Sequence, residues 1–156
     1  MRKQFVKSLI KLAKSDKSII LLTADLGFNV LEPFQKEFPD RYINVGCIEQ
    51  TMLGMSAGLA KMGMKPYVYS NSCFLIYRAL EQLRNDICYP NYNVKLIGTQ
   101  GTQYNFLGIS HNIGKDDVKI LKLLPNIEIY TPKTIKEVDK VISVSYNNRK
   151  PTYVRL

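Results

Sequence analysis

The stretch Asn44-Val-Gly-Cys-Ile-Glu-Gln-Thr-Met-Leu-Gly-Met-Ser-Ala-Gly-Leu-Ala-Lys-Met-Gly63 decides the fold of this chain. It predicts the end of a strand, a tight turn at Gly46 and a helix with Glu49 in its first turn. Small residues on one side of that helix would let another backbone approach closely: Gly54, Ala57 and Gly58. The helix dipole alone would favour an acid at Glu49, so a functional role for Glu49 needs support from the rest of the chain.

The composition is that of an ordinary soluble globular domain. The 156 residues are 46% apolar and 22% charged, which is enough to build one domain with a real core. No apolar run approaches the ~20 residues of a membrane span. Residues 1–14 interleave Lys with apolar side chains and lack the unbroken apolar core of a signal peptide. We therefore expect a single domain over residues 1–156, located in the cytoplasm.

Cysteine and charge patterns exclude two classes of site. Cys47, Cys73 and Cys88 form no C-x-x-C pair, and with a single His they predict reduced, mostly buried thiols rather than a zinc site. The net charge of +9 invites a nucleic-acid partner, but the Lys and Arg residues are scattered. An anionic ligand or an acidic partner subunit explains the charge as well. We expect neither nucleic acid nor membrane as a partner.

Helical and strand patterns alternate along the chain. Besides the helix that begins at Glu49, helical spacing marks residues 2–15, 30–38, 74–88, 116–124 and 134–146. Short apolar runs predict strands at residues 18–23, 42–45, 65–69, 93–98, 127–130 and 152–156. This alternation predicts an α/β three-layer sandwich with a mainly parallel sheet.

Chemically capable side chains follow the first four predicted strands. Asp25 follows the first strand, Glu49 the second, residues 71–74 the third and His111 the fourth. Because the carboxyl ends of parallel strands share one edge, we expect these residues on one rim of the sheet. Any parallel sheet has polar loops there, so the convergence by itself also fits a purely structural interpretation.

An ordered set of motifs resembles a known family. Its segments are Leu22–Gly27, Phe38–Gln50, Ser56–Ala60, Gly63, Pro66, Tyr77–Asp86, Gly108–His111, Asp116–Asp117, Leu124–Asn126 and Thr131–Pro132. Together they resemble the pyrimidine-binding domain of transketolase-like enzymes, which include transketolase, its split bacterial C-terminal subunit and deoxyxylulose-phosphate synthase. The resemblance covers roughly residues 19–156.

The resemblance implies thiamine diphosphate as the cofactor. In this family the residue that matches Glu49 hydrogen-bonds ring nitrogen N1′ of the aminopyrimidine, and so helps the exocyclic nitrogen take the thiazolium C2 proton. The cofactor then carries the hard chemistry and the protein tunes it. His111 matches a His that contacts the donor's hydroxyl or the intermediate. Glu49 and His111 are therefore the expected catalytic residues.

The expected cofactor-binding residues are Asp25, Glu49, Phe74 and Arg78. Phe74 matches the aromatic that packs on the pyrimidine, and Asp25 matches an acid at the edge of the thiazolium pocket. From the residues alone, core packing explains Phe74 equally well, a turn explains Asp25, and solvation explains His111. The resemblance favours the functional interpretation of each.

One motif of the family is absent from this sequence. The Gly-Asp-Gly and later Asn that mark the diphosphate- and metal-binding domain do not occur here, and the family's C-terminal domain is absent too. The resemblance thus implies a partner subunit that carries the diphosphate-binding domain and holds Mg²⁺ or Ca²⁺, unless this chain is cut from a longer enzyme. We expect a homodimer or heterotetramer that is inactive without this partner.

Three positions depart from the family pattern. Leu107 stands where transketolases have an Asp that reads a sugar hydroxyl, and an apolar side chain cannot accept that hydrogen bond. Asn29 replaces a Ser near the substrate phosphate, and Asn71 replaces an aromatic. The expected reaction on a small-molecule substrate is transfer of a two-carbon ketol unit. Two alternatives stay open: a 2-oxo acid decarboxylase or carboligase subunit, and a non-catalytic interaction module that kept the fold.

Overall fold

The computed structural model describes residues 1–99 and 108–156. Within them, six strands form one sheet in the order β2-β1-β3-β4-β6-β5, and every neighbouring pair is parallel. The strands are β1 (Ile19–Thr23), β2 (Tyr42–Asn44), β3 (Lys65–Asn71), β4 (Lys95–Thr99), β5 (Glu128–Tyr130) and β6 (Thr152–Arg155). The predicted parallel sheet and its strand order along the chain are confirmed.

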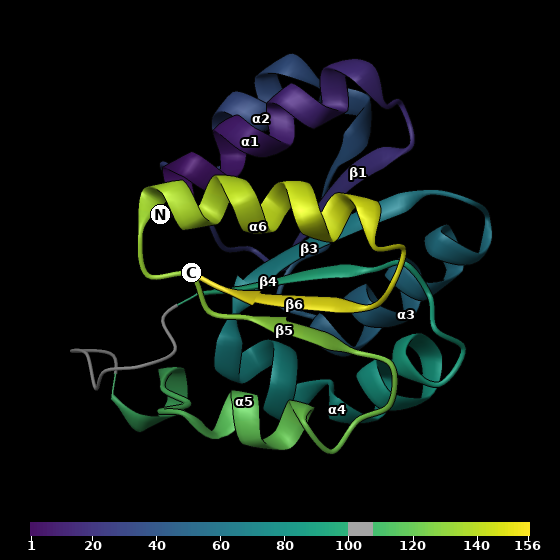
Figure 1. Ribbon diagram of the computed structural model, residues 1–156, viewed down its shortest axis with the longest axis vertical. Helices are drawn as coiled ribbons and strands as arrows, with labels where there is room; N and C mark the ends of the chain where they lie inside the picture. The colour runs from purple at the N-terminus through teal and green to yellow at the C-terminus, as the bar shows by residue number, and fades with distance from the viewer. Residues whose placement is uncertain (100–107) are drawn as a thin grey trace.

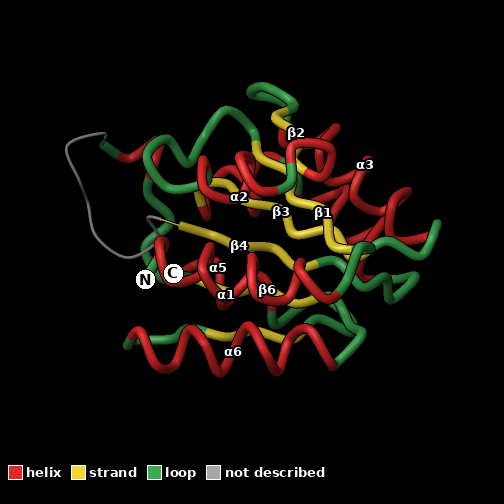
Figure 2. The backbone as a smooth tube through the Cα atoms, turned by 90° about the horizontal axis from the view of Figure 1, so that it is seen from above, coloured by secondary structure: helices red, strands yellow, loops and turns green. Residues whose placement is uncertain are grey.

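Helices cover both faces of this sheet, as Figures 1 and 2 show. One face carries α1 (Arg2–Ser15), α2 (Glu32–Glu37) and α6 (Ile135–Asn147). The other face carries α3 (Glu49–Lys61), η2 (Phe74–Arg78), α4 (Leu80–Gln82), η3 (Leu83–Cys88) and α5 (Asp116–Leu121). Two short 3₁₀ turns are η1 (Pro39–Arg41) and η4 (Ile109–His111). The three-layer α/β sandwich is therefore confirmed. No helix in the described ranges is long and apolar enough to cross a bilayer.

The apolar run of β1 explains why both faces are covered. Successive side chains of a strand point to opposite faces. Ile20 and Leu22 accordingly join the core under α3, whereas Ile19 and Leu21 join the core under α1 and α6. All four are buried, so an unbroken apolar strand requires a helical layer on each side.

The segment predicted as one helix over residues 74–88 is helical, but most of it is not α-helical. Both η2 and η3 are π-helical, and only the three residues of α4 between them are α-helical. The apolar spacing in this segment fits either winding, so the sequence pattern could not separate them. A π-turn is wider than an α-turn and is frequent at functional sites. Here it places the side chains of Phe74 and Arg78 in contact.

Candidate functional site

Glu49 is the first residue of α3 and is buried, with 3% of its surface exposed. The chain reaches it from β2 through Gly46, whose φ of 79° suits glycine. Glu49 Oε2 lies 3.3 Å from Arg78 Nη1, and Glu49 Oε1 accepts a long hydrogen bond of 3.4 Å from Ser70 Oγ. The Arg78 side chain is 51% exposed. A buried carboxylate is thus held by long contacts and by a cation that reaches in from solvent.

Arg78 also covers an aromatic ring. Its guanidinium carbon lies 3.7 Å from the centroid of Phe74, which is a cation–π contact. Phe74 is 7% exposed and packs in the core under α3. Arg78 therefore joins the two residues that were predicted to hold the pyrimidine.

His111 also contacts the Phe74 ring. The two rings meet edge to face, with centroids 5.0 Å apart and an interplanar angle of 68°. The backbone around His111 is fixed by the end of β3, because Asn71 Nδ2 donates to the His111 carbonyl at 3.2 Å. Cys73 Sγ likewise donates to the Ser110 carbonyl. Burial raises the pKa of the Cys73 thiol to about 11, so the thiol keeps the proton that it donates.

Asp25 lies on the neighbouring turn rather than in this chain of contacts. It is exposed and has a positive φ of 53°. Its N–H donates to Asn44 Oδ1 at 2.9 Å, and Asn44 Nδ2 donates to Asp25 Oδ1 at 3.2 Å. Asn44 Oδ1 also accepts from the N–H of Gly46, at 3.1 Å. Asn44 therefore ties Asp25 to the turn that leads into α3, a link that was not predicted although Asn before a glycine turn is a known signal.

A pocket of about 300 Å³ lies at the start of α3, and of the predicted site residues Glu49 and Arg78 line it, whereas Phe74, His111 and Asp25 do not. This volume is at the lower end of the range of ligand pockets, ~300–1,000 Å³. Cys47 also lines it and is exposed, whereas Cys73 and Cys88 are buried. The expectation of mostly buried thiols thus holds for two of the three cysteines.

The three positions that depart from the family pattern lie in different environments or outside the described residues. Leu107 lies outside the described residues. Asn29 is exposed, has a φ of 62° and donates its N–H to Glu32 Oε1 at 2.7 Å. Asn71 is 2% exposed and serves the loop that carries His111, as described above.

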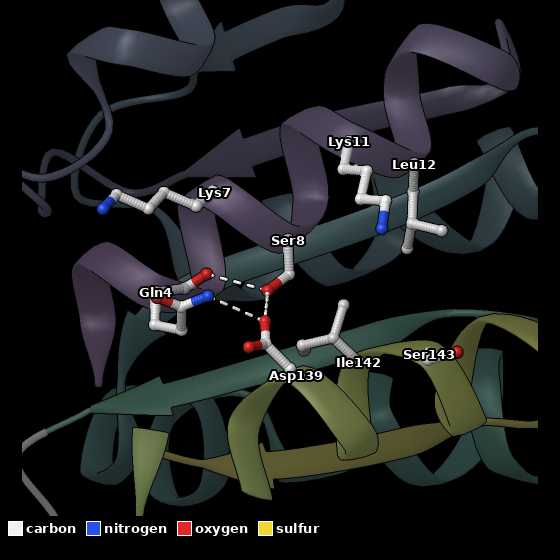
Figure 3. Close-up of a pocket in the computed structure, with 8 residues that line it drawn as sticks. All are labelled: Gln4, Lys7, Ser8, Lys11, Leu12, Asp139, Ile142 and Ser143. Atoms are coloured by element: carbon white, nitrogen blue, oxygen red, sulfur yellow. Dashed lines mark hydrogen bonds between the residues drawn. The ribbon is translucent and has the colours of Figure 1, made fainter. Parts of the chain in front are cut away.

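A larger hollow, of about 620 Å³, lies between α1 and α6 on the opposite face of the sheet (Figure 3). Asp139 of α6 points into it and accepts hydrogen bonds from Gln4, at 2.8 Å, and from Ser8. These bonds join the two helices, so the carboxylate is already engaged. None of the residues predicted for the site lines this hollow. We therefore assign it to helix packing and place the candidate site at the Glu49 pocket.

Known proteins match the whole chain. The family model described as transketolase, pyrimidine binding domain, matches residues 1–156. One of the subunits of the apulose-4-phosphate transketolase of Phocaeicola vulgatus is 36% identical over 99% of this chain and 50% of its own length. The 1-deoxy-D-xylulose-5-phosphate synthase of Halothermothrix orenii is 36% identical over 97% of this chain and 24% of its own length.

A solved structure matches equally well. A split gene transketolase, described as an inactive beta4 tetramer, superposes with a TM-score of 0.88 at 32% identity. The match covers 99% of this chain and 50% of that chain. The present chain therefore spans about half the length of this structure and of the Phocaeicola protein, and about a quarter of the synthase.

Proposed function

This chain belongs to the transketolase pyrimidine-binding domain family, and we propose that it binds the aminopyrimidine ring of thiamine diphosphate and activates the cofactor through Glu49. The reaction that we propose is transfer of a two-carbon ketol unit. The observation that carries the proposal is a carboxylate with 3% exposure that is joined through Arg78 to an aromatic ring, at a pocket on the carboxyl edge of a parallel sheet.

The residues present fit an aminopyrimidine. Such a ring needs a carboxyl group that can share a proton with ring nitrogen N1′ and an apolar surface for its face. Glu49 and Phe74, which both contact Arg78, offer these. The planar guanidinium of Arg78 already makes both kinds of contact, to the Glu49 carboxylate at 3.3 Å and to the Phe74 ring at 3.7 Å. A planar heterocycle that carries an N–H can make the same two contacts. When bound, thiamine diphosphate supplies the carbanion chemistry that ketol transfer requires.

We assign to Glu49 the hydrogen bond to ring nitrogen N1′. Because its carboxylate is buried, a hydrogen bond to it is stronger than one in water. Its present bonds, of 3.3 and 3.4 Å, are longer than the 2.7–2.9 Å typical of charge-assisted bonds. A ring N–H can therefore replace them with a shorter one. Arg78, half exposed, compensates the charge of Glu49 and can withdraw into solvent.

His111 and Asp25 serve the parts of the ligand beyond the pyrimidine. His111 lies on the far side of Phe74 from Arg78 in the chain of contacts, so we assign it to the substrate hydroxyl or the reacting carbon unit. Asp25 stands on the turn joined to β2 by Asn44, and we assign it to the edge of the thiazolium pocket.

The proposed partner is a second subunit that carries the diphosphate-binding domain and its Mg²⁺ or Ca²⁺. The Phocaeicola relative is named as one subunit of a transketolase, which supports a divided enzyme. An open surface on α3 supports an assembly: a Cβ added at Gly54 or Gly58 would have no described atom within 4 Å. Met55 on the same helix and Met62 directly after it are 39% and 83% exposed. We propose that another subunit covers this surface. Ala57, which the sequence grouped with Gly54 and Gly58, does not belong to the surface because it is buried in the core.

The substrate class that we propose is a sugar phosphate or a related ketose. The relative from Phocaeicola is named for apulose 4-phosphate, which supports a sugar phosphate, and the changes at Leu107 and Asn29 leave the identity of that sugar open. A 2-oxo acid substrate remains the alternative outcome of a substrate screen.

Substitution of Glu49 by Gln in the assembled enzyme tests the proposal. The amide keeps the shape but cannot hold the proton, so we expect activity to fall by about 10²–10⁴-fold. The matched control is Glu37→Gln, which alters an exposed carboxylate of α2, and it should retain full activity. Full activity in the Glu49 variant would refute the assigned role. Absence of cofactor binding by the wild-type assembly would instead favour a non-catalytic interaction module.

A further inference from the structure

A buried polar network lies beneath the site, where β6, the end of β3 and the start of α5 meet. It consists of Ser72, Asp117, Tyr153 and Arg155, and we call it the Tyr153 network. The Tyr153 hydroxyl lies 2.8 Å from Asp117 Oδ2 and 2.9 Å from Ser72 Oγ. Arg155 Nη1 donates to Asp117 Oδ1 at 2.8 Å. Ser72, Asp117 and Tyr153 are all fully buried.

The directions of these bonds follow from the donors available. A phenol has one proton, and a carboxylate can only accept. Tyr153 therefore donates to Asp117, and the Ser72 hydroxyl supplies the proton of the bond between the two hydroxyls. Burial raises the pKa of Tyr153 well above its usual value, so the phenol stays a donor. The network is thus satisfied in a single arrangement, which is what fixes geometry in a buried site.

Gly98 of β4 makes room for this arrangement. A Cβ at that position would lie 2.6 Å from Ser72 Oγ and 2.6 Å from the Tyr153 hydroxyl. Both distances are shorter than any tolerable contact, so a side chain at position 98 would force the hydroxyls apart. The glycine in the middle of the sheet therefore permits the network to form.

The Tyr153 phenol is bonded to both segments that carry the rings of the site. Ser72 is two residues before Phe74, and Asp117 is six residues after His111. Phe74 and His111 are the two rings that meet edge to face at 5.0 Å. One hydroxyl thus holds the β3 segment on one side and the segment after His111 on the other.

We propose that Tyr153 is a positioning residue that sets His111 against Phe74. The effect of this positioning on catalysis rests on the proposed function. The placement of the His111 ring against the Phe74 ring does not, because both residues belong to this chain. Loss of the Tyr153 hydroxyl frees Ser72 and one oxygen of Asp117. Within the described residues, the two ring-bearing segments then keep only the bonds from Asn71 and Cys73 to the loop of His111, and His111 moves relative to Phe74.

Nuclear magnetic resonance of the full chain tests this directly. His111 is the only histidine, so its imidazole protons give one unambiguous pair of signals. In the wild type the nearby Phe74 ring displaces these signals from their positions in the urea-unfolded chain. Tyr153→Phe removes one oxygen atom and keeps the ring, and we expect the His111 signals to move toward the unfolded positions.

The matched control is Tyr67→Phe. Tyr67 is buried as completely as Tyr153, but its hydroxyl has no hydrogen-bond partner within the described residues. The control should leave the His111 signals in place. Unchanged signals in Tyr153→Phe, or equal movement in the two variants, would overturn the proposal. Ser72→Ala, which breaks only the link to the β3 segment, should shift the signals in the same direction and decides the matter if Tyr153→Phe does not fold.

Kinetics of the assembled enzyme separate this proposal from the proposed function. Misplacement of a catalytic group by about 1 Å costs roughly 10²-fold in rate, so kcat should fall by about that factor in Tyr153→Phe, with KM changed far less. A loss confined to KM would contradict a positioning role. If the His111 signals move as expected while Glu49→Gln remains fully active, the positioning role stands and the proposed function fails.

Discussion

At the amino-terminal edge of the sheet, Asp16 Oδ2 accepts hydrogen bonds from Lys65 Nζ at 2.6 Å and from the Tyr146 hydroxyl at 2.9 Å. At the carboxyl-terminal edge, Glu49 reaches its cation, Arg78, only at 3.3 Å. The Lys65 side chain is 27% exposed and that of Arg78 is 51% exposed. One edge therefore holds its carboxylate with short bonds, and the other holds a more deeply buried carboxylate by long contacts and a half-exposed cation.

Lys95 shows the same closed arrangement at the amino-terminal edge. It is 1% exposed, and its Nζ donates to Asn148 Oδ1, the Lys150 carbonyl and Thr152 Oγ1 at 2.6, 2.7 and 3.3 Å. Three acceptors match the three protons of an ammonium group. The comparison teaches that the charged groups at the amino-terminal edge already have short hydrogen bonds within the fold, whereas the buried Glu49 keeps capacity to bind a ligand.

Asp16→Asn should produce the largest loss of stability. The change removes the charge that pairs with Lys65 and weakens the bond from Tyr146, so we expect a loss of about 2 kcal/mol in the free energy of unfolding. Urea denaturation at neutral pH measures it. An effect below that of Arg78→Met would break the comparison between the two edges.

The stability difference between wild type and Asp16→Asn should depend on pH. Burial alone would raise the pKa of Asp16, but hydrogen bonds from Lys65, Ser18 and Tyr146 outweigh it and hold this pKa well below its usual range. A depressed folded pKa contributes stability above the unfolded value of about 4, and this is lost as the pH falls through the folded pKa. The stability gap between wild type and Asp16→Asn should therefore shrink on acidification below about pH 4. A gap that widens there would contradict the assignment.

Lys95→Met should have an intermediate effect with the opposite pH dependence. Burial lowers the pKa of Lys95 to about 7, helped by Lys65 and opposed by Glu128. Between about pH 7 and 10 the unfolded chain binds a proton that the folded chain does not, so wild-type stability rises with pH in that window. The variant loses about 1–2 kcal/mol near pH 7, because three acceptors lose their donor, and it lacks this rise. Unfolding curves at several pH values compare the two, and a parallel rise would count against the prediction.

Arg78→Met should change stability by less than about 1 kcal/mol, because the ion pair to Glu49 is long and the Arg78 side chain is half exposed. Thermal unfolding of the chain gives this value. Glu49→Gln is measured in parallel. A small loss of stability in both variants would support a Glu49 carboxylate whose role is to bind a ligand. A loss as large as that of Asp16→Asn would make the Glu49 pair structural.

Tyr67→Phe should have the smallest effect, and a favourable one. The buried Tyr67 hydroxyl has no hydrogen-bond partner in the described part of the chain, so its removal ends a desolvation cost. We expect unfolding free energy to stay level or rise by up to about 1 kcal/mol, whereas Tyr153→Phe should lose stability. Calorimetry of both variants in parallel makes the comparison.

The sequence predicted the sheet and its layers because apolar periodicity is a local property. The run from Ile19 to Leu22 already required cover on two faces, and the turn at Gly46 already placed Glu49 at a helix start. Periodicity could not reveal the π-helical winding of residues 74–88, because apolar side chains at these spacings satisfy either helix.

Contacts between distant segments were beyond the sequence. The bond from Asn44 to Asp25 spans 19 positions, and that between Tyr153 and Ser72 spans 81. Asp117 was matched only as part of a motif, and nothing local marked its burial beneath β6. Such partners are brought together by the register of the sheet, which a single sequence does not contain.

Cofactor affinity in the assembled enzyme tests the central claim most directly. Titration calorimetry with thiamine diphosphate and Mg²⁺ compares wild type, Glu49→Gln and Asp16→Asn, each assembled with the subunit that carries the diphosphate-binding domain. A charge-assisted hydrogen bond is worth about 1.5–3 kcal/mol, so Glu49→Gln should bind about 10–100-fold more weakly. Asp16→Asn should bind like the wild type. Equal affinity for wild type and Glu49→Gln, or weakened binding in Asp16→Asn alone, would contradict the division of roles between the two edges.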